Sequence, residues 1–398
     1  MTKPPVYCDY NAGAPIRAEA AVAMSRALAS GGNASSVHSI GRRMRAMIED
    51  ARERIASALD AQAENVVFTS GATEALHLVL DTFDAHWRAA NPAPARDPDL
   101  DFDRPPEPQP EPSLIIAECE HDALFEDGRR RAMLRAPLQR SGLVDLGILG
   151  AVIREAPKPA LLALQLANNE TGVIQPVAQV AALCREHGAL LLVDAAQAFG
   201  RIPVSIADLD AAYLVVSSHK LGGPPGAGAL VLAPGAPFVT TRFGGGQERG
   251  RRPGTENGAA LVGFATAVEW ALKDREAEAK RVAALRDRFE AGLPKDAVVF
   301  GAGAPRLPNT SNFALPGLNA ETAVIAMDLE GVAISSGAAC SSGKVKSSRV
   351  LAAMGVAPEL AKAALRVSFG HESKDADVNE ALHALNKIAA RRAQGAAA

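Results

Sequence analysis

The sequence has few cysteines and little net charge, and these shortages exclude several classes of protein. Its 398 residues include only Cys8, Cys119, Cys184 and Cys340, with no Cys-x-x-Cys pair. This argues against a disulfide framework or a zinc knuckle, and we expect no metal site. The formal net charge is −3, so bulk charge predicts no nucleic acid or other polyanion as a partner.

Long apolar runs are also missing. No segment approaches the roughly 20 apolar residues that a helix needs to span a bilayer, so we expect no membrane segment. The N-terminal stretch MTKPPVYCDYN lacks the apolar core of a signal peptide. We therefore expect a cytoplasmic protein.

Short apolar runs alternate with longer helical patterns between about residues 50 and 235. The predicted strands are residues 66–69, 114–118, 161–167, 190–194, 213–218 and 228–233. Unbroken apolar strands separated by helices are typical of a mostly parallel sheet with helices on both faces, an α/β fold.

The length of the chain favours two domains. Residues 91–112 are rich in proline and acids and lack periodicity, which favours a solvated, partly disordered loop over a docking segment. From residue 258 a long helical stretch leads to four short apolar segments, which indicate a smaller α+β domain. We assign residues 13–256 to the large domain and 257–398 to the small one, with segment 1–12 joining them.

Lys220 stands where the buried strand of VVSSHKLGGPPGAG breaks into a loop. Lysine is rarely buried, but a desolvated lysine with a lowered pKa is what imine chemistry requires. Asp194 ends the strand LLLVD, where it either caps a following helix or holds a proton on a heterocyclic nitrogen. Because adjacent strands are about 4.8 Å apart, both side chains could flank one aromatic ring.

The segment TSGATEA, residues 69–75, is predicted to open a helix directly after a strand. The N–H groups of Gly71, Ala72 and Thr73, with the helix dipole, would form a seat for a phosphate. The segment lacks the GxGxxG and GxxxxGK[ST] patterns, which disfavours a dinucleotide or a nucleoside triphosphate. A phosphate seat, a carboxylate for a pyridinium nitrogen and an imine-forming lysine together specify pyridoxal 5'-phosphate (PLP).

Other polar residues could surround the same ring. Gln197 could bond the ring hydroxyl, and Ser217 and His219 could hold the phosphate. His121 could lie over the ring face, although a lone histidine is more often structural.

Three further residues follow or interrupt strands that lead toward the same region. Asn168 and Asn169 in LANNETG are both explained by a turn. Arg366 in ALRVSFG has a planar fork that suits a substrate carboxylate, and a surface salt bridge is the alternative.

The sequence resembles the cysteine desulfurases of the NifS/IscS-like group, PLP enzymes of fold type I among the class V aminotransferases. The resemblance runs nearly end to end and rests on VYCDYNAGAP, GGNASSVHSIGR, FTSGATEA, ECEHDAL, LANNETGVIQP, VDAAQAFG, SSHKLGGPPGAG, GGGQERGRRPGTEN, ISSGAACSSG and LRVSFG. It implies a seven-stranded, mostly parallel sheet in the large domain.

The resemblance also implies roles for individual residues. Lys220 carries PLP as a Schiff base, Asp194 holds the pyridine nitrogen, Gln197 contacts the ring oxygen and His121 stacks on the ring. The implied cofactor-binding residues are Gly71, Ala72, Thr73, His121, Asn169, Asp194, Gln197, Ser217, His219, Lys220 and Thr255. The implied substrate-binding residues are Asn11, Asn169 and Arg366. Thr255 is expected to reach the phosphate of a neighbouring subunit, which makes a homodimer necessary.

Cys340 lies in SSGAACSSGKVKSS, a loop of small residues that looks mobile. In the family the matching cysteine attacks the sulfur of the bound substrate and becomes a persulfide. In this sequence, Lys344 and Lys346 are close enough along the chain to favour the thiolate of Cys340 electrostatically. The implied catalytic residues are Lys220, Cys340 and His121. The implied reaction converts L-cysteine to L-alanine and passes sulfur to an acceptor, such as an iron–sulfur scaffold or a thiolation protein.

Two other interpretations remain at this point. One is another PLP enzyme of this fold, such as a selenocysteine lyase or an aminotransferase, and Cys340 on its loop argues for desulfuration instead. The other is a non-catalytic binding platform, and the presence of Lys220, Asp194, His121 and Cys340 argues against it. The segment YNAGAP and the 91–112 insertion depart from the usual family pattern.

Overall fold

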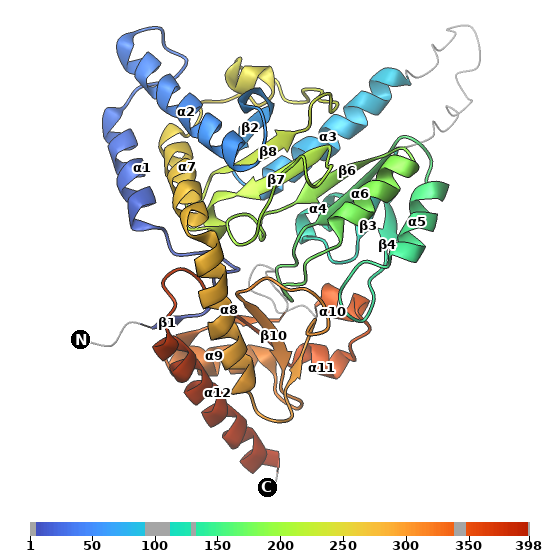
Figure 1. The fold of residues 1–398 in the computed structure, drawn as a ribbon, viewed down its shortest axis with the longest axis vertical. Coiled ribbons are helices and arrows are strands. Elements are labelled where there is room, and N and C mark those ends of the chain that lie inside the picture. The colour runs from blue at the N-terminus through green and yellow to red at the C-terminus, as the bar shows by residue number, and fades with distance from the viewer. Residues whose placement is uncertain (1–4, 92–111, 129–132, 338–347, 397–398) are drawn as a thin grey trace, which may run out of the picture.

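Seven strands of the chain form one sheet, in the order β2-β8-β7-β6-β5-β3-β4 (Figure 1). A computed structural model describes residues 5–91, 112–128, 133–337 and 348–396. The strands are β2 (Val66–Thr69), β3 (Ser113–Ala117), β4 (Met133–Ala136), β5 (Ala160–Gln165), β6 (Ala189–Asp194), β7 (Tyr213–Ser217) and β8 (Gly228–Leu232). Neighbours are parallel from β7 to β4, and β8 runs antiparallel to both β7 and β2. The predicted α/β fold with a mostly parallel seven-stranded sheet is confirmed.

Helices cover both faces of this sheet. Successive side chains of a strand point to opposite faces of the sheet. Leu114 and Ile115, which are neighbours in β3, accordingly pack in hydrophobic clusters on opposite faces. One face packs on α3 (Ala72–Ala90) and α4 (Asp122–Gly128). The other face packs on α2 (Ser39–Ala58), α5 (Leu146–Glu155), α6 (Val177–Glu186) and α7 (Gly258–Lys273).

The edge strand β4 was not predicted from the sequence. Its residues MLRA are buried only at Ala136, and the strand pairs only with β3 at the edge of the sheet. An edge strand of this kind has no continuous apolar run, so the pattern that found the other strands of the sheet is missing here.

A second, smaller sheet with its helices lies below the main sheet in Figure 1 and has a hydrophobic core of its own. This four-stranded antiparallel sheet has the order β12-β13-β10-β9. The strands are β9 (Val298–Val299), β10 (Thr310–Ala314), β12 (Ser335–Ser336) and β13 (Ala364–Ser368), with a separate parallel pair of β1 (Val6–Tyr7) and β11 (Val332–Ala333). The helices around it are α8 (Arg275–Ala291), α9 (Ala320–Leu329), α10 (Arg349–Ala353), α11 (Pro358–Lys362) and α12 (Asp375–Ala396). The N-terminal segment takes part through Val6 and Cys8.

The two cores divide later in the chain than the expected boundary after residue 256. The buried side chains of α7, among them Phe264 and Val268, belong to the core of the main sheet, and α7 packs on α1 (Ala18–Ser30) and α2. The predicted helical stretch 258–291 breaks at Asp274, and only α8 contributes to the second core. Helix α7 is apolar on most of its surface and can therefore be buried in the first core.

Two further results concern sequence expectations. No helix in the described ranges combines the length and the apolar character needed to cross a membrane. Residues 92–111 of the proline-rich insertion lie outside the described residues.

Candidate active site

A cavity of about 400 Å³ opens at the carboxyl ends of the main-sheet strands, where ligands gather in open α/β sheets. The predicted site residues that line it are Asn11, Gly71, Ala72, Thr73, His121, Asn169, Asp194, Gln197, Ser217, His219, Lys220 and Arg366. They come from the N-terminal segment, from five strand ends of the main sheet and from β13 of the second sheet. The cavity therefore lies between the two cores.

Lys220 ends a short 3₁₀ turn, η2 (Ser218–Lys220), directly after β7. Its Nζ donates hydrogen bonds to the carbonyl oxygens of Asn11 at 2.7 Å and Ala12 at 3.0 Å. The amine is thus held at the cavity wall by the N-terminal segment.

Asp194 is the last residue of β6 and pairs in register with Val215 of the neighbouring β7. Its Oδ1 accepts a hydrogen bond from the N–H of Ala196 at 2.9 Å. Residues 195–200 form a turn, so the alternative of a helix N-cap is wrong. Burial raises the pKa of Asp194, against the lowering effects of the Ala196 N–H, His121 and Lys220.

His121 directly precedes α4 and is exposed to the cavity. Its Nδ1 accepts a hydrogen bond from the N–H of Ala123 at 3.1 Å, so the proton of the neutral ring is on Nε2. The surrounding protein shields the ring from bulk water, and this desolvation lowers the pKa of His121. A neutral ring can lie flat against an aromatic ligand without the cost of burying a charge.

The segment Gly71–Thr73 begins α3, a helix of 19 residues, and lines the cavity. Gly228 of β8 lies so close that a Cβ at this position would be 2.7 Å from the Cα of Gly71. Only glycine therefore fits at Gly228, and its absent side chain lets the turn pack on the sheet. The N-terminal N–H groups of such a helix favour an anion.

Ser217 and His219 lie beside this helix terminus on the cavity wall. Ser217 Oγ is 3.0 Å from His219 Nδ1. Burial, together with Lys220 and Arg201, lowers the pKa of His219 to about 4. One proton lies in the bond between the two groups, so either the neutral imidazole, through Nε2, or the hydroxyl can donate a hydrogen bond to a phosphate oxygen.

Glu74 also lines the cavity, although the sequence analysis did not assign it a role. Its carboxylate accepts hydrogen bonds from the N–H of Ser70 and from the guanidinium groups of Arg242 and Arg252. Burial raises the pKa of Glu74, but the hydrogen bonds from Arg252 and Ser70 lower it to about 2. An acidic residue in the first turn of a helix stabilises it, so the position of Glu74 after TSGAT could have indicated a structural role for its carboxylate.

Arg366 is buried in β13. It donates from Nη2 to Asp9 Oδ1 at 2.6 Å and from Nη1 to the carbonyl oxygen of Asn169 at 3.0 Å. The alternative of a surface salt bridge is wrong, since the side chain of Arg366 is 1% exposed. Its Nε is buried without a hydrogen-bond partner, an unsatisfied donor in a residue that lines the cavity.

The structure separates the two asparagines of LANNETG. Asn168 Oδ1 accepts from the N–H groups of Glu170 and Thr171 and from the Thr171 hydroxyl. Asn168 therefore forms the turn that the sequence suggested for either residue. Asn169 lines the cavity beside Arg366.

Two predicted residues are not part of this arrangement. Thr255 is exposed and is not among the residues that line the cavity. Cys340 lies outside the described residues.

The other three cysteines are buried. Burial raises the pKa of Cys8 and of Cys184 to about 12 and also raises the pKa of Cys119. These three thiols are therefore poor sources of a thiolate near neutral pH.

The residues present fit PLP by the chemistry of their side chains. One cavity of about 400 Å³ is lined by a primary amine, a buried carboxylate and a helix N-terminus. These groups match the aldehyde, the ring nitrogen and the phosphate of that cofactor. Arg366 also lines this cavity, and a guanidinium suits an additional anionic group, such as a carboxylate.

Comparisons with known proteins give one consistent family. The sequence matches the profile of the family Aminotransferase class-V over residues 6–92 and 104–381. It is 34% identical to cysteine desulfurase IscS of Dictyoglomus turgidum over 392 residues, 96% of this chain and 94% of that protein. It is 37% identical to a cysteine desulfurase of Cereibacter sphaeroides over 389 residues, 96% of this chain and 95% of that protein.

A solved structure has the same fold. A NifS-like protein from Rickettsia africae superposes with a TM-score of 0.85 at 27% sequence identity. The alignment covers 96% of this chain and 99% of that one, so the resemblance includes both cores.

Proposed function

This chain belongs to the class V aminotransferase family and is a PLP-dependent cysteine desulfurase, and on that premise we propose how its own residues carry out the reaction. When bound, PLP supplies an electron-withdrawing ring that accepts charge from the substrate. Asp194 holds a proton on the ring nitrogen. The N-terminus of α3, with Ser217 and His219, binds the phosphate. His121, which lines the same cavity, would pack against the ring.

The substrate is L-cysteine, and its carboxylate is bound between the two cores. Arg366 and Asn169 lie together on the β13 side of the cavity and bind this group. Asn11 lies beside them, where its Nδ2 donates to the carbonyl oxygen of Asn169 at 3.1 Å. Lys220 Nζ moves the proton at the substrate Cα.

Cys340 is the proposed nucleophile. Its thiolate sulfur attacks the substrate sulfur, so that an S–S bond forms while the Cβ–S bond breaks. The electron pair of the broken bond stays on carbon, which takes up a proton, and the skeleton leaves as L-alanine. The persulfide on Cys340 then passes its outer sulfur to an acceptor protein, an iron–sulfur scaffold or a thiolation enzyme, in the cytoplasm.

The active form is proposed to be a homodimer. Thr255 is exposed on the loop before α7 and does not line the cavity of its own chain. A residue in this position is available to complete the phosphate site of a partner, and a two-fold dimer is the simplest closed arrangement.

The observation that carries the proposal is the meeting of Lys220, Asp194 and the α3 N-terminus at one cavity. The test is to load the purified protein with PLP, add L-cysteine and measure L-alanine and protein-bound sulfur with time. We expect both in equal amounts in the first turnover. A PLP-loaded protein that releases no L-alanine would contradict the proposal.

A further inference from the structure

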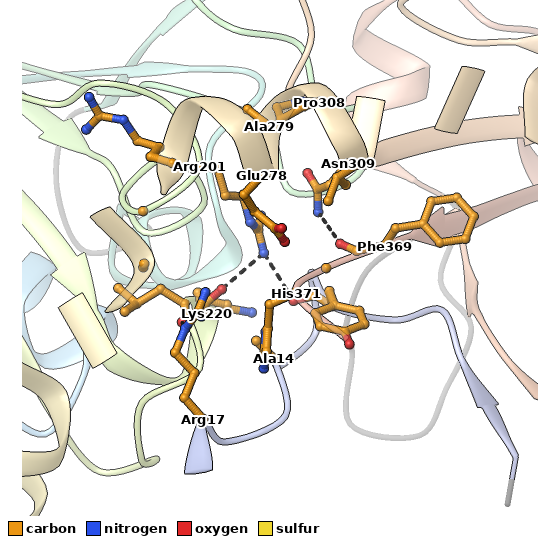
Figure 2. A pocket seen from close by; sticks show the side chains of 17 residues that line it. Ala14, Arg17, Arg201, Lys220, Glu278, Ala279, Pro308, Asn309, Phe369 and His371 are labelled. Carbon is orange, nitrogen blue, oxygen red and sulfur yellow. Dashed lines mark hydrogen bonds between the residues drawn. The ribbon is translucent and has the colours of Figure 1, made fainter. Parts of the chain in front are cut away.

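Arg201 lies behind the active site, in a second cavity of about 50 Å³ shown in Figure 2. Lys220 lines both this cavity and the larger one. Arg201 follows Gly200, whose φ of 83° favours glycine and where a Cβ would be 3.1 Å from the Cβ of Leu221. The tight turn at Gly200 brings the guanidinium of Arg201 within hydrogen-bonding distance of the Lys220 carbonyl oxygen.

The guanidinium of Arg201 joins three segments of the active site. Nη2 donates to the carbonyl oxygens of Tyr10 at 3.1 Å and Lys220 at 3.2 Å. Nη1 donates to the carbonyl oxygen of Gln197 at 3.1 Å and to its side-chain Oε1 at 2.5 Å. One side chain thus fixes the N-terminal segment, the turn after β6 and the lysine backbone relative to one another.

The hydrogen bond from Arg201 to Oε1 fixes the orientation of the Gln197 side-chain amide. A guanidinium has donors only, so Oε1 must face Arg201 and the amide nitrogen must face away from it. Nε2 of Gln197 donates to the carbonyl oxygen of Asn11 at 2.9 Å. An amide nitrogen carries two hydrogens, and Gln197 also lines the larger cavity. Its second N–H is therefore the donor available to a ring oxygen there.

Arg201 is a cation surrounded by neutral acceptors. No carboxylate of the described residues forms an ion pair with it. Burial, and to a smaller extent Arg366, lowers the pKa of Arg201 to about 9. Its positive charge is weakly screened in this environment. The charge polarises the Gln197 amide and so strengthens the hydrogen bond that the amide N–H donates.

From these contacts we infer that Arg201 is a positioning residue, which orients the Gln197 amide as a donor to the ring oxygen of PLP and favours the ionised form of that oxygen. The inference rests on the proposed function, because it requires PLP in the larger cavity. Arg201 acts through Gln197 and does not itself contact the cofactor.

The test is the pH titration of the cofactor's visible absorption band in Arg201→Met, Arg201→Lys and the unchanged protein. Loss of a positive charge near the ring oxygen makes its ionised form less favourable. We expect the midpoint to be about one pH unit higher in Arg201→Met than in the unchanged protein. In Arg201→Lys, which keeps the positive charge, the midpoint should be close to that of the unchanged protein. Arg185→Met is the matched control, since Arg185 is 69% exposed and pairs with Asp210. The control should leave the midpoint unchanged.

A double-mutant cycle separates this role from a purely structural one. If Arg201 acts through Gln197, then Arg201→Met in a Gln197→Leu background should shift the midpoint no further. An equal shift with and without Gln197 would overturn the inference, as would an Arg201→Met variant with a lowered melting temperature and an unchanged midpoint. If Arg201→Met does not fold, Arg201→Gln, which also removes the charge, replaces it in the cycle. A protein that develops no visible band with PLP would instead refute the proposed function.

Discussion

The guanidinium of Arg52 donates to both carboxylate oxygens of Glu248, at 2.7 and 2.8 Å. Both side chains are buried, with 4% and 1% exposed, and the N–H of Phe68 in β2 also donates to Glu248 at 2.8 Å. Glu248 has a left-handed backbone, with φ of 49°. The ion pair therefore anchors a strained turn, and this turn leads to the loop that carries Thr255.

Removing the charge of Glu248 should destabilise the protein strongly. Glu248→Gln leaves the buried Arg52 guanidinium with Glu49 as its remaining counter-ion, 3.1 Å from Nε, so we expect a loss of about 2–3 kcal/mol in the free energy of unfolding. Urea denaturation followed by circular dichroism measures it. Arg54, in the same helix α2 as Arg52, forms an exposed ion pair with Glu269. Glu269→Gln is the control and should lower the free energy of unfolding by less than about 1 kcal/mol. Similar losses in the two variants would contradict the role assigned to burial.

Glu74 should make the stability depend on pH in the acid range. Its pKa is lowered from 4.5 to about 2 in the folded protein, so its contribution is present above pH 4.5 and is lost as the pH falls toward 2. We expect Glu74→Gln to have a lower melting temperature than the unchanged protein at pH 7 and the same one near pH 2. The exposed Glu359→Gln is the control. A difference between Glu74→Gln and the unchanged protein that persists undiminished at low pH would refute the interpretation.

Lys220→Ala should remove turnover. The variant lacks the amine that forms the imine and moves the substrate proton, so we expect L-alanine release to fall by more than about 10²-fold. PLP can still bind through its phosphate, but borohydride should no longer attach it covalently to the protein. Lys362→Ala, on the surface of α11, is the control and should keep both properties. Full activity in Lys220→Ala would mean that another amine does the chemistry.

Cys340→Ser should separate cofactor binding from sulfur transfer. We expect PLP binding and the spectral response to L-cysteine to survive, while L-alanine release and protein-bound sulfur are lost. Cys184 is buried in α6, and Cys184→Ser should keep the chemistry. Mass spectrometry that finds the added sulfur on Cys8 or Cys119 after L-cysteine treatment, with Cys340→Ser active, would show that the nucleophile is misassigned.

Thr255→Ala should weaken the hold on PLP without changing the fold of one chain, because Thr255 is exposed in it. We expect faster loss of PLP on dialysis, and sedimentation should show a dimer in both proteins. Thr322→Ala, at an exposed position of α9, is the control. An active, PLP-loaded monomer would refute the shared site.

The fold was predictable where a strand is apolar along its whole length. Strand β5 is buried at every residue, so its sequence carries the signal directly. Strand β4 lies at the edge with three of four residues partly or fully exposed, and no such signal exists there. The burial of α7 in the first core depends on what packs around it, and a helical pattern does not reveal that neighbour.

The sequence by itself determined which chemical groups stand at the strand ends, because strands and turns follow from local residue patterns. Lys220 after one apolar strand and Asp194 after its neighbour were readable in this way, and they specify the cofactor. Only the tertiary structure decided that Asn168 forms a turn while Asn169 lines the cavity, and that Arg366 is buried. It alone joined Arg201 to Tyr10 and Lys220, which are 191 and 19 residues away. Such contacts form only when distant segments pack together, and no local pattern encodes them.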